Sequence, residues 1–223
     1  MSRTLEWALA GERVILHGDK ALYYPAQAAL MVADTHFGKG AFFRRKGLAV
    51  PTGQSQDDLQ RLSALIAHFE PQRLIVLGDF FHHRPRAGEP FLEQFPDWLA
   101  RHRHVQVEAV IGNHDRHAKG IDIGIPWHST LDIGPFRLCH EPETVAGRHV
   151  LAGHLHPVYS LSAAGDRLRA PVFWCREGVT VLPSFGALTG GWDIQPQAGE
   201  AAVLVVEGEL YPMGTRAGIR GRC

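Results

Sequence analysis

The segment AALMVADTH (residues 28–36) is an apolar run that ends in Asp34 and His36. The segments RLIVLGD (73–79) and VQVEAVIGNHD (105–115) have the same form, with apolar residues followed by Gly-Asp and by Gly-Asn-His-Asp. Runs of this kind are typical of strands buried on both faces, as in a parallel or mixed sheet between helices. The sequence therefore predicts a sheet whose strands end in polar side chains.

Helices are predicted between these strands. In residues 55–71 (SQDDLQRLSALIAHFEP), Ser55 can cap a helix and Pro71 ends it. The apolar residues of this segment fall on one helical face: Leu59, Leu62, Leu65, Ile66 and Phe69. Residues 89–102 (EPFLEQFPDWLARH) predict a second helix, in which Pro96 favours a kink.

The rest of the chain has the pattern of strands. Short apolar runs separated by glycine turns occupy residues 5–25, and strand-like segments follow from residue 136 to residue 212. Alternating strands and helices that give way to strands are typical of layered α/β packing. Because no linker or repeat interrupts the pattern, we expect one domain over residues 1–223, with a flexible Gly/Arg-rich tail at about 214–223.

Composition limits the classes of protein. Hydrophobic residues make up 45% of the 223 residues, which suits a soluble fold, and no apolar run is long enough to cross a membrane. Residues 1–12 lack the apolar core of a secretory signal, and three cysteines are too few for a disulfide framework. We therefore expect a cytoplasmic protein without membrane contact. The net charge of zero leaves nucleic-acid binding undecided.

Polar residues follow five of the predicted strands. They are Asp34 and His36, Asp79, Asn113 to Asp115, His140, and His154 and His156. Side chains at the ends of separate strands of an α/β sheet converge on one point, and residues two apart share one face of an extended chain. Each motif alone is usually a turn or a surface feature. Together, their carboxylate, carboxamide and imidazole groups predict a site for manganese, iron or zinc.

The order of these motifs resembles that of the calcineurin-like metallophosphoesterase superfamily. The matching pattern is Asp34-x-His36, Gly-Asp79, Gly-Asn113-His114-Asp115, His140 and Gly-His154-x-His156. The resemblance implies an α/β fold, a four-layer α/β/β/α sandwich of two mixed sheets flanked by helices.

Further segments resemble one bacterial subgroup, the ligase-associated DNA damage response endonucleases or DNA-ligase-associated phosphoesterases. They are GKGAFFRRKG (38–47), GDFFHHR (78–84), CHEP (139–142), GHLHP (153–157) and LPSFGALTGG (182–191). The chain departs from the subgroup at Thr35 and Phe37, neither of which is a ligand position.

The resemblance also implies roles for single residues. One divalent ion would be held by Asp34, His36 and His156, a second by Asn113, His140 and His154, and Asp79 would bridge the two. Mn²⁺ is the expected metal, with iron or Zn²⁺ as alternatives. His114 would be the general acid or a positive charge near the leaving oxygen, and Asp115 would orient it.

The expected function is hydrolysis of phosphodiester bonds, in DNA during repair, by a nuclease or a 3′-end phosphoesterase. A DNA ligase or helicase of a repair system is the expected protein partner. A small-molecule nucleotide phosphodiesterase or pyrophosphatase is the alternative enzyme. A catalytically silent scaffold that binds proteins is the non-enzymatic alternative, although no ligand or catalytic histidine is missing.

Basic residues near the motifs are candidates for substrate binding. They are Lys39, Arg44, Arg45 and Lys46, then Arg116 and Lys119, with His82 and His83 close to Asp79. Such residues can hold the phosphates that flank a scissile bond, and Phe42 and Phe43 could stack on bases. The same clusters also fit an ordinary solvated loop, so the sequence leaves this point open.

Overall fold

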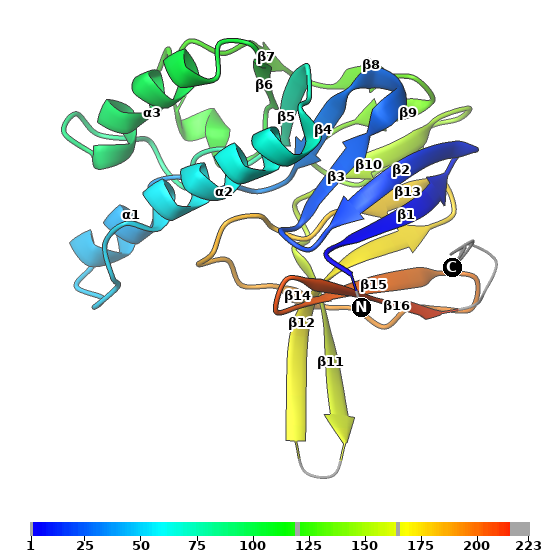
Figure 1. Cartoon of the computed structure of the whole chain (residues 1–223). Helices are drawn as coiled ribbons and strands as arrows, with labels where there is room; N and C mark the ends of the chain where they lie inside the picture. Colours follow the sequence, from blue (N-terminus) through cyan, green and yellow to red (C-terminus); the bar gives the residue numbers. More distant parts are fainter. Residues whose placement is uncertain (1, 119–120, 164–165, 215–223) are drawn as a thin grey trace.

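The computed structural model describes residues 2–118, 121–163 and 166–214. Its first sheet contains β1 (Thr4–Leu9), β2 (Glu12–His17), β3 (Ala21–Tyr24), β4 (Ala29–Val32), β5 (Arg73–Leu77), β6 (Gln106–Val110) and β7 (Trp127–His128), in that order (Figure 1). The strands from β1 to β4 are antiparallel, and those from β4 to β7 are parallel. The flexible tail predicted at about 214–223 lies almost wholly outside the described residues.

The second sheet is built from the later part of the chain. Its strands are β8 (Leu131–Ile133), β9 (Phe136–Leu138), β10 (His149–Ala152), β11 (Pro157–Ala163), β12 (Asp166–Arg176), β13 (Val179–Val181), β14 (Trp192–Asp193), β15 (Ala201–Val206) and β16 (Glu209–Gly214). The main order is β14-β11-β12-β13-β10-β9-β8, and β15 pairs with β12 and β16. Because β10 is parallel to β9 and β13, and β11 is parallel to β14, while the remaining pairs are antiparallel, this sheet is also mixed.

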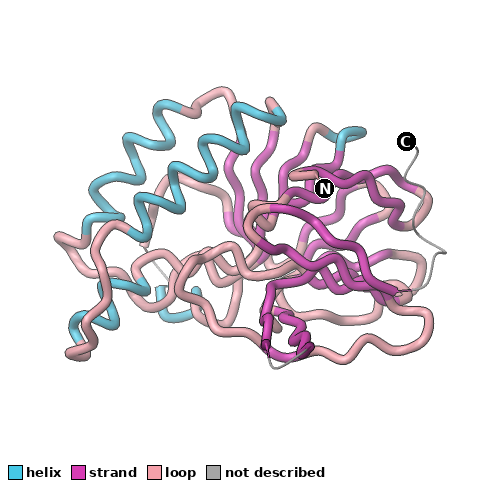
Figure 2. The backbone as a smooth tube through the Cα atoms, turned by 60° about the horizontal axis from the view of Figure 1, so that its bottom comes forward, coloured by secondary structure: helices cyan, strands magenta, loops and turns pink. Residues whose placement is uncertain are grey.

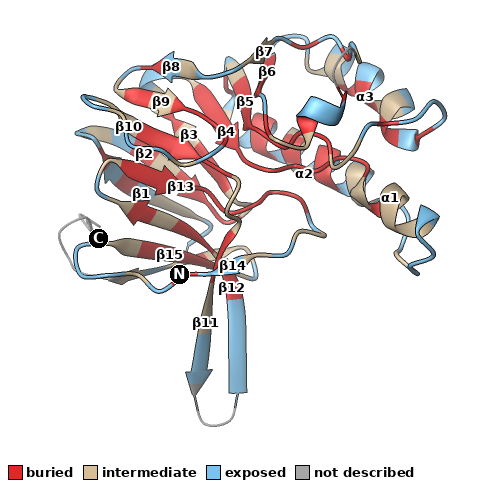
Figure 3. Ribbon diagram, turned by 180° about the vertical axis from the view of Figure 1, so that it is seen from behind, coloured by how far each residue is buried: buried red, intermediate tan, exposed pale blue. Residues whose placement is uncertain are grey.

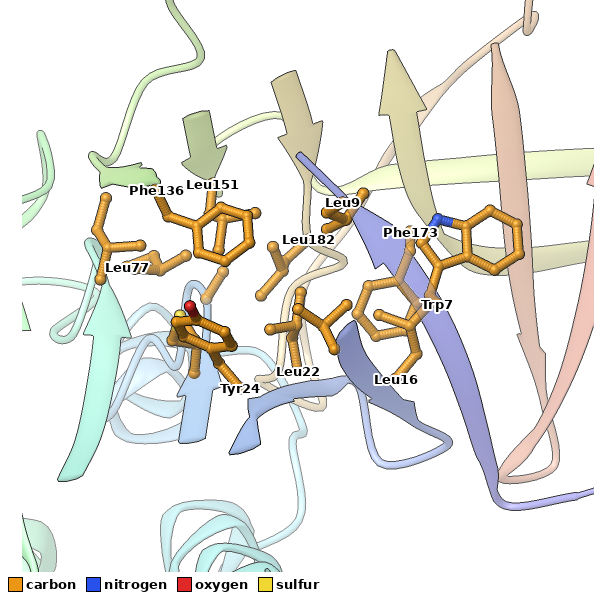
Figure 4. Packing of buried hydrophobic residues seen from close by; sticks show 14 of the residues in the cluster. Trp7, Leu9, Leu16, Leu22, Tyr24, Leu77, Phe136, Leu151, Phe173 and Leu182 are labelled. Atoms are coloured by element: carbon orange, nitrogen blue, oxygen red, sulfur yellow. The ribbon is translucent and has the colours of Figure 1, made fainter. Parts of the chain in front are cut away.

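The inner faces of the two sheets form the main core. Trp7, Leu22 and Tyr24 of the first sheet pack against Phe136 and Phe173 of the second (Figure 4). All of these side chains are at most 5% exposed, so each contributes the full transfer free energy of a buried apolar group, roughly 1.5–3 kcal/mol.

The helices are α1 (Lys39–Arg45), α2 (Gln54–Phe69) and α3 (Pro90–Arg101), and they lie together on one side of the molecule (Figure 2). The buried faces of α2 and α3 pack on Leu30, Leu74 and Val76, on the outer face of the first sheet. The α/β class with two mixed sheets is confirmed. Over the described residues, however, the outer face of the second sheet is covered by Val145, Leu155 and Ile194 from connecting segments rather than by helices.

Two of the three α-helices match the sequence prediction. The apolar face predicted for α2 is the buried face, and α3 is continuous through Pro96. Ser55 does not cap α2, because its Oγ accepts a hydrogen bond from the N–H of Gly38 and Gly53 is the N-cap. Helix α1 was not predicted, since its seven residues, KGAFFRR, carry no repeating apolar face.

A long hairpin of β11 and β12 projects from the body of the protein (Figures 1 and 3). Leu161 pairs with Leu168 across it, and both side chains are exposed. Among the described residues, no helix is long and apolar enough to span a membrane.

The buried histidine at the end of β2 should make stability depend on pH. Burial lowers the pKa of His17 from 6.5 to about 4. Between these values the unfolded chain binds the proton and the folded chain does not, so stability falls as the pH drops from 6.5 to 4, by on the order of 3 kcal/mol. Urea unfolding of His17→Asn, which keeps an acceptor for the Asp19 N–H, should show a shallower decline. His104→Asn, at an exposed histidine, is the control and should match the wild type.

Candidate metal centre

All seven predicted metal ligands lie just beyond strand ends, on one edge that both sheets share. Asp34 and His36 follow β4, Asp79 follows β5, Asn113 follows β6, His140 follows β9, and His154 and His156 follow β10. Parallel strands deliver their carboxyl ends to the same edge, which is why segments far apart in the sequence meet there.

Four of these residues form a compact group. The ligand atoms of Asp34, His36, Asp79 and His156 all lie within 4.8 Å of one another. His36 Nε2 is 3.3 Å from His156 Nε2 and 3.8 Å from Asp79 Oδ2, and His156 Nε2 is 3.6 Å from Asp34 Oδ1. These contacts surround one common point, as ligand atoms around an ion would.

The other three residues adjoin this group through Asp79. His140 Nε2 lies 2.7 Å from Asn113 Oδ1, 3.1 Å from His154 Nδ1 and 3.4 Å from Asp79 Oδ1. Asp79 therefore presents Oδ1 to the group around His140 and Oδ2 to the group around His36. Its carboxylate stands between two sets of nitrogen and oxygen donors.

The backbone at this edge differs from what the sequence suggested. Asp34, His36, Asp79, His154 and His156 all have positive φ, between 46° and 68°. Non-glycine residues rarely adopt this left-handed conformation, which costs about 1–3 kcal/mol and gathers at functional sites. The side chains of Asp34 and His36 thus converge because the backbone turns sharply at each residue. They do not converge because they share one face of an extended strand, as the sequence suggested.

The electrostatics of the group fit a cation. Asp34 and Asp79 are buried together, at 0% and 2% exposure, and their ion-pair partners among the described residues are histidines. Burial lowers the pKa of His36, which favours the neutral imidazole that binds metal, and its Nδ1 is buried without a hydrogen-bond partner. Two buried carboxylates repel each other unless a positive charge lies between them. The donor set therefore fits divalent metal ions.

Small residues make the close packing of these ligands possible. A Cβ atom added to Gly78, where φ is +77°, would lie 2.1 Å from His140 Nδ1. One added to Gly153 would lie 2.6 Å from Asp34 Oδ2. The glycines that precede Asp79 and His154 thus leave the room that the neighbouring ligands occupy.

His114 stands at the rim of the centre with a fixed ring. Its Nδ1 is 2.6 Å from the carbonyl oxygen of His82, so Nδ1 carries the hydrogen and donates it. Its Nε2 points inward, 4.0 Å from Asp79 Oδ2. The ring stacks on that of His82, and these two histidines and His36 form a second group with ligand atoms within 4.8 Å.

Asp115 has a different partner from the one expected. Its carboxylate accepts hydrogen bonds from the backbone N–H groups of Phe80, Phe81 and Gly112, rather than from the ring of His114. Burial raises its pKa to about 6, against the opposing effect of those three bonds. Asp115 therefore joins the loop after β5 to the loop after β6. The ring of His114 is oriented by the carbonyl of His82 instead.

The candidate substrate residues are divided between two places. A groove of about 920 Å³ beside His114 is lined by Arg45, His82 and His83, with Phe42 and Lys46. Lys39 lies outside this groove, in a narrow cleft that it shares with His36. Burial lowers the pKa of Lys39.

Three other candidates are not in this groove. Arg44 donates to the carbonyl oxygen of Pro51, 2.6 Å away, and so is tied to its own loop. Arg116 is exposed on the 3₁₀-helix η2 (Asp115–Ala118), and Lys119 lies outside the described residues.

Sequence reasoning missed other residues that line the groove or support it. Arg86 and His117 line the groove outside every motif, and Arg84, which also lines it, ends the segment GDFFHHR without having been assigned a role. Glu89 lies at the start of a predicted helix, where an acidic residue is unremarkable, yet its buried carboxylate pairs with Arg45 and contacts His83.

The sequence matches no family model and no curated protein. Among solved structures it is similar to the Pseudomonas putida nuclease MPE, with 37% identity over 94% of this chain and 100% of that chain, and a TM-score of 0.83. A phosphoesterase from E. coli, Yfce, is 18% identical over 86% of this chain and 97% of its own, with a TM-score of 0.42, too weak to bear on the site.

The two-sheet α/β fold and its centre of carboxylate and imidazole ligands define the class of metal-dependent phosphoesterases. The high identity over almost the whole chain places the protein within that class. It belongs to the calcineurin-like metallophosphoesterase family.

Replacing Asp115 should destabilise the loops that carry the centre. Asp115→Asn removes one acceptor oxygen and turns an N–H₂ group towards a backbone N–H, so we expect a loss of about 1–3 kcal/mol. Urea unfolding of the metal-free protein measures it. Asp122→Asn, at an exposed aspartate that accepts one backbone bond, should change stability little. Equal stability of the two variants would contradict the role assigned to Asp115.

Proposed function

We propose that the protein is a two-metal phosphodiesterase that cleaves DNA, as a nuclease or a 3′-end phosphoesterase. The observation that carries the proposal is the arrangement of seven donors in two adjoining groups that share Asp79. A relative that is 37% identical over its whole length is described as a nuclease, which supports this substrate class.

In this proposal, Asp34, His36 and His156 hold one ion, Asn113, His140 and His154 hold the other, and Asp79 contacts both. Nitrogen and oxygen donors without thiolate suit Mn²⁺, with iron or Zn²⁺ as alternatives. Cys139 is no competing ligand, because its Sγ donates to the carbonyl oxygen of Glu141 and its side chain packs with Val150 and Val181. When bound, divalent ions supply Lewis-acid stabilisation of phosphoryl oxygens and activation of water.

In this proposal, His114 supplies the proton that the leaving oxygen takes up. Because its Nδ1 donates to the carbonyl of His82, the inward Nε2 is the atom free to exchange a proton with the leaving oxygen. Its side chain is 35% exposed, so it can also exchange that proton with solvent afterwards. A ring that is held by one contact and turns its other nitrogen towards the candidate ligands supports the role of general acid.

The groove beside His114 supplies the contacts for a polymeric substrate. Arg45 and Lys46 offer positive charge for phosphates that flank the scissile one, and Phe42 offers a face for a base. Basic side chains and an aromatic face along one groove support DNA over the alternative, a nucleotide phosphodiesterase or pyrophosphatase. A cytoplasmic location and a DNA ligase or helicase as partner complete the proposal.

Hydrolysis of bis-p-nitrophenyl phosphate by metal-stripped protein tests the reaction. Addition of Mn²⁺ should restore turnover, and metal content of His114→Ala should stay at the wild-type level. His114→Ala should lower the rate on DNA by about 10²–10⁴-fold, and the rate on this diester less, because p-nitrophenolate leaves without a proton. His104→Ala, at an exposed histidine that is not a candidate ligand, is the control. Full activity of His114→Ala on this diester and on DNA would refute its role. Absence of turnover with every metal, at occupied sites, would favour a protein-binding scaffold.

Metal affinity should depend on the small residue at position 78. Gly78→Ala places a methyl group against His140 and should weaken binding of Mn²⁺ by about 10–100-fold, as loss of support around a ligand does. Gly11→Ala introduces the same left-handed strain, with φ of +80°, where nothing lies within 4 Å. Calorimetric titration of the two variants separates the effects. Equal affinities would show that the contact with His140 is unimportant.

A further inference from the structure

The segment LPSFGALTGG (residues 182–191) is a motif that neither the ligand set nor the proposed reaction uses. It follows β13 of the second sheet, and its Ser184 forms an isolated parallel bridge with Ala33 of the first. Ala33 directly precedes the candidate ligand Asp34. The segment therefore reaches the metal centre without supplying a ligand to it.

Three hydrogen bonds from this segment fix the backbone at Asp34. The Oγ of Ser184 donates to the carbonyl oxygen of Asp34 at 2.9 Å, and the N–H of Gly186 donates to the same oxygen at 3.2 Å. The N–H of Phe185 donates to the carbonyl oxygen of Ala33 at 2.7 Å. Asp34 has a φ of 53°, a left-handed conformation that persists where the surrounding structure determines it. These bonds supply part of that constraint.

Glycines let the segment lie directly on the backbone of the candidate ligands. A Cβ atom added to Gly186 would lie 2.6 Å from the carbonyl oxygen of Thr35, and one added to Gly191 would lie 2.6 Å from that of His156. The N–H of Trp192 also donates to the His156 oxygen, at 3.1 Å. Because there is no room for a side chain at either glycine, the segment approaches the ligand backbone at two further points.

A cluster of charged side chains also holds the segment. Lys20 Nζ and Arg61 Nη1 both donate to the carbonyl oxygen of Phe185, at 2.8 and 3.1 Å. The guanidinium of Arg61 lies 4.0 Å from the centre of the Phe185 ring and pairs with Asp58 at 2.8 Å. The carboxylate of Asp58 is buried and accepts a hydrogen bond from the N–H of Ala187. Two cations and one buried carboxylate therefore fix the part of the segment that contacts the ligand backbone.

We propose that Ser184 is a positioning residue, which holds Asp34 in the backbone conformation that turns its carboxylate to the metal centre. The inference rests on the proposed function, in which Asp34, His36 and His156 hold one of two ions. Supporting contacts one step removed from the ligands are typically worth about 10–100-fold in metal affinity. Because the segment contacts the backbone of Asp34 and of His156, this ion is the one whose binding depends on Ser184.

Calorimetric titration of the metal-free, full-length protein with Mn²⁺ tests the inference. In Ser184→Ala, the carbonyl oxygen of Asp34 keeps the bond from Gly186 and loses the other. One of the two Mn²⁺ ions should then bind about tenfold more weakly, while the second keeps its wild-type affinity. Electron paramagnetic resonance of the partly loaded variant should show isolated Mn²⁺ instead of a coupled pair. A serine that contributed to stability alone would not separate the two ions.

Two further variants frame this measurement. Ser63→Ala is the matched control, because the Oγ of Ser63 also donates to a backbone carbonyl, that of Leu59 at 3.0 Å within α2. It should leave both Mn²⁺ affinities at the wild-type level. Asp58→Asn keeps an acceptor for the segment and removes the charge that neutralises Arg61. It should weaken the binding of one ion, as Ser184→Ala does, through the cluster.

Hydrolysis of bis-p-nitrophenyl phosphate gives an independent readout. Ser184→Ala should need about tenfold more Mn²⁺ for its half-maximal rate and should reach the wild-type rate at saturation, because Ser184 acts through metal binding. Wild-type affinities for both ions in Ser184→Ala and Asp58→Asn, or an equal loss at both ions, would overturn the inference. If the wild type binds two ions and hydrolyses no phosphodiester, the proposed function is refuted, and the affinities still decide the role of Ser184.

Discussion

The structure depends on two carboxylates, Asp34 and Asp79, that are buried side by side among histidines. Such a pair is unfavourable in a protein interior unless cations neutralise it. The surrounding chain bears further costs for the same arrangement. Five of the seven candidate ligands have left-handed backbone, and glycines are packed against His140 and Asp34. These costs are consistent with a centre in which the free energy of metal binding offsets them and contributes to folding stability.

The framework that tolerates this strain is the pair of sheets. Parallel strands of both sheets end at one edge, and a core of large apolar side chains between the sheets fixes their relation (Figure 4). Hydrogen bonds then hold the loops at the edge. Asp115 joins two loops of the first sheet, and the N–H of His154 in the second sheet donates to Asp34 in the first. The centre is thus held across the interface of the two layers.

Helix α1 and the segment around Glu89 give the centre its surroundings. Arg45 and His83 face the groove, and the carboxylate of Glu89 supports both from behind. The other oxygen of the same carboxylate is buried without a hydrogen-bond partner among the described residues. One buried side chain therefore supports two residues of the groove and also lines a smaller cavity behind them.

The sequence by itself determined the class of fold, α2 and α3, and the set of polar residues at strand ends, because apolar periodicity and motif order are local properties of the chain. Contacts between distant segments were decided only by the tertiary structure. They include the pairing of Asp115 with backbone N–H groups, the His82 carbonyl that orients His114, and the burial of Glu89 between two cavities. The left-handed turns at Asp34 and His36 could not be predicted from the sequence either. The type of side chain does not indicate a strained backbone, because only the surrounding packing holds such a conformation.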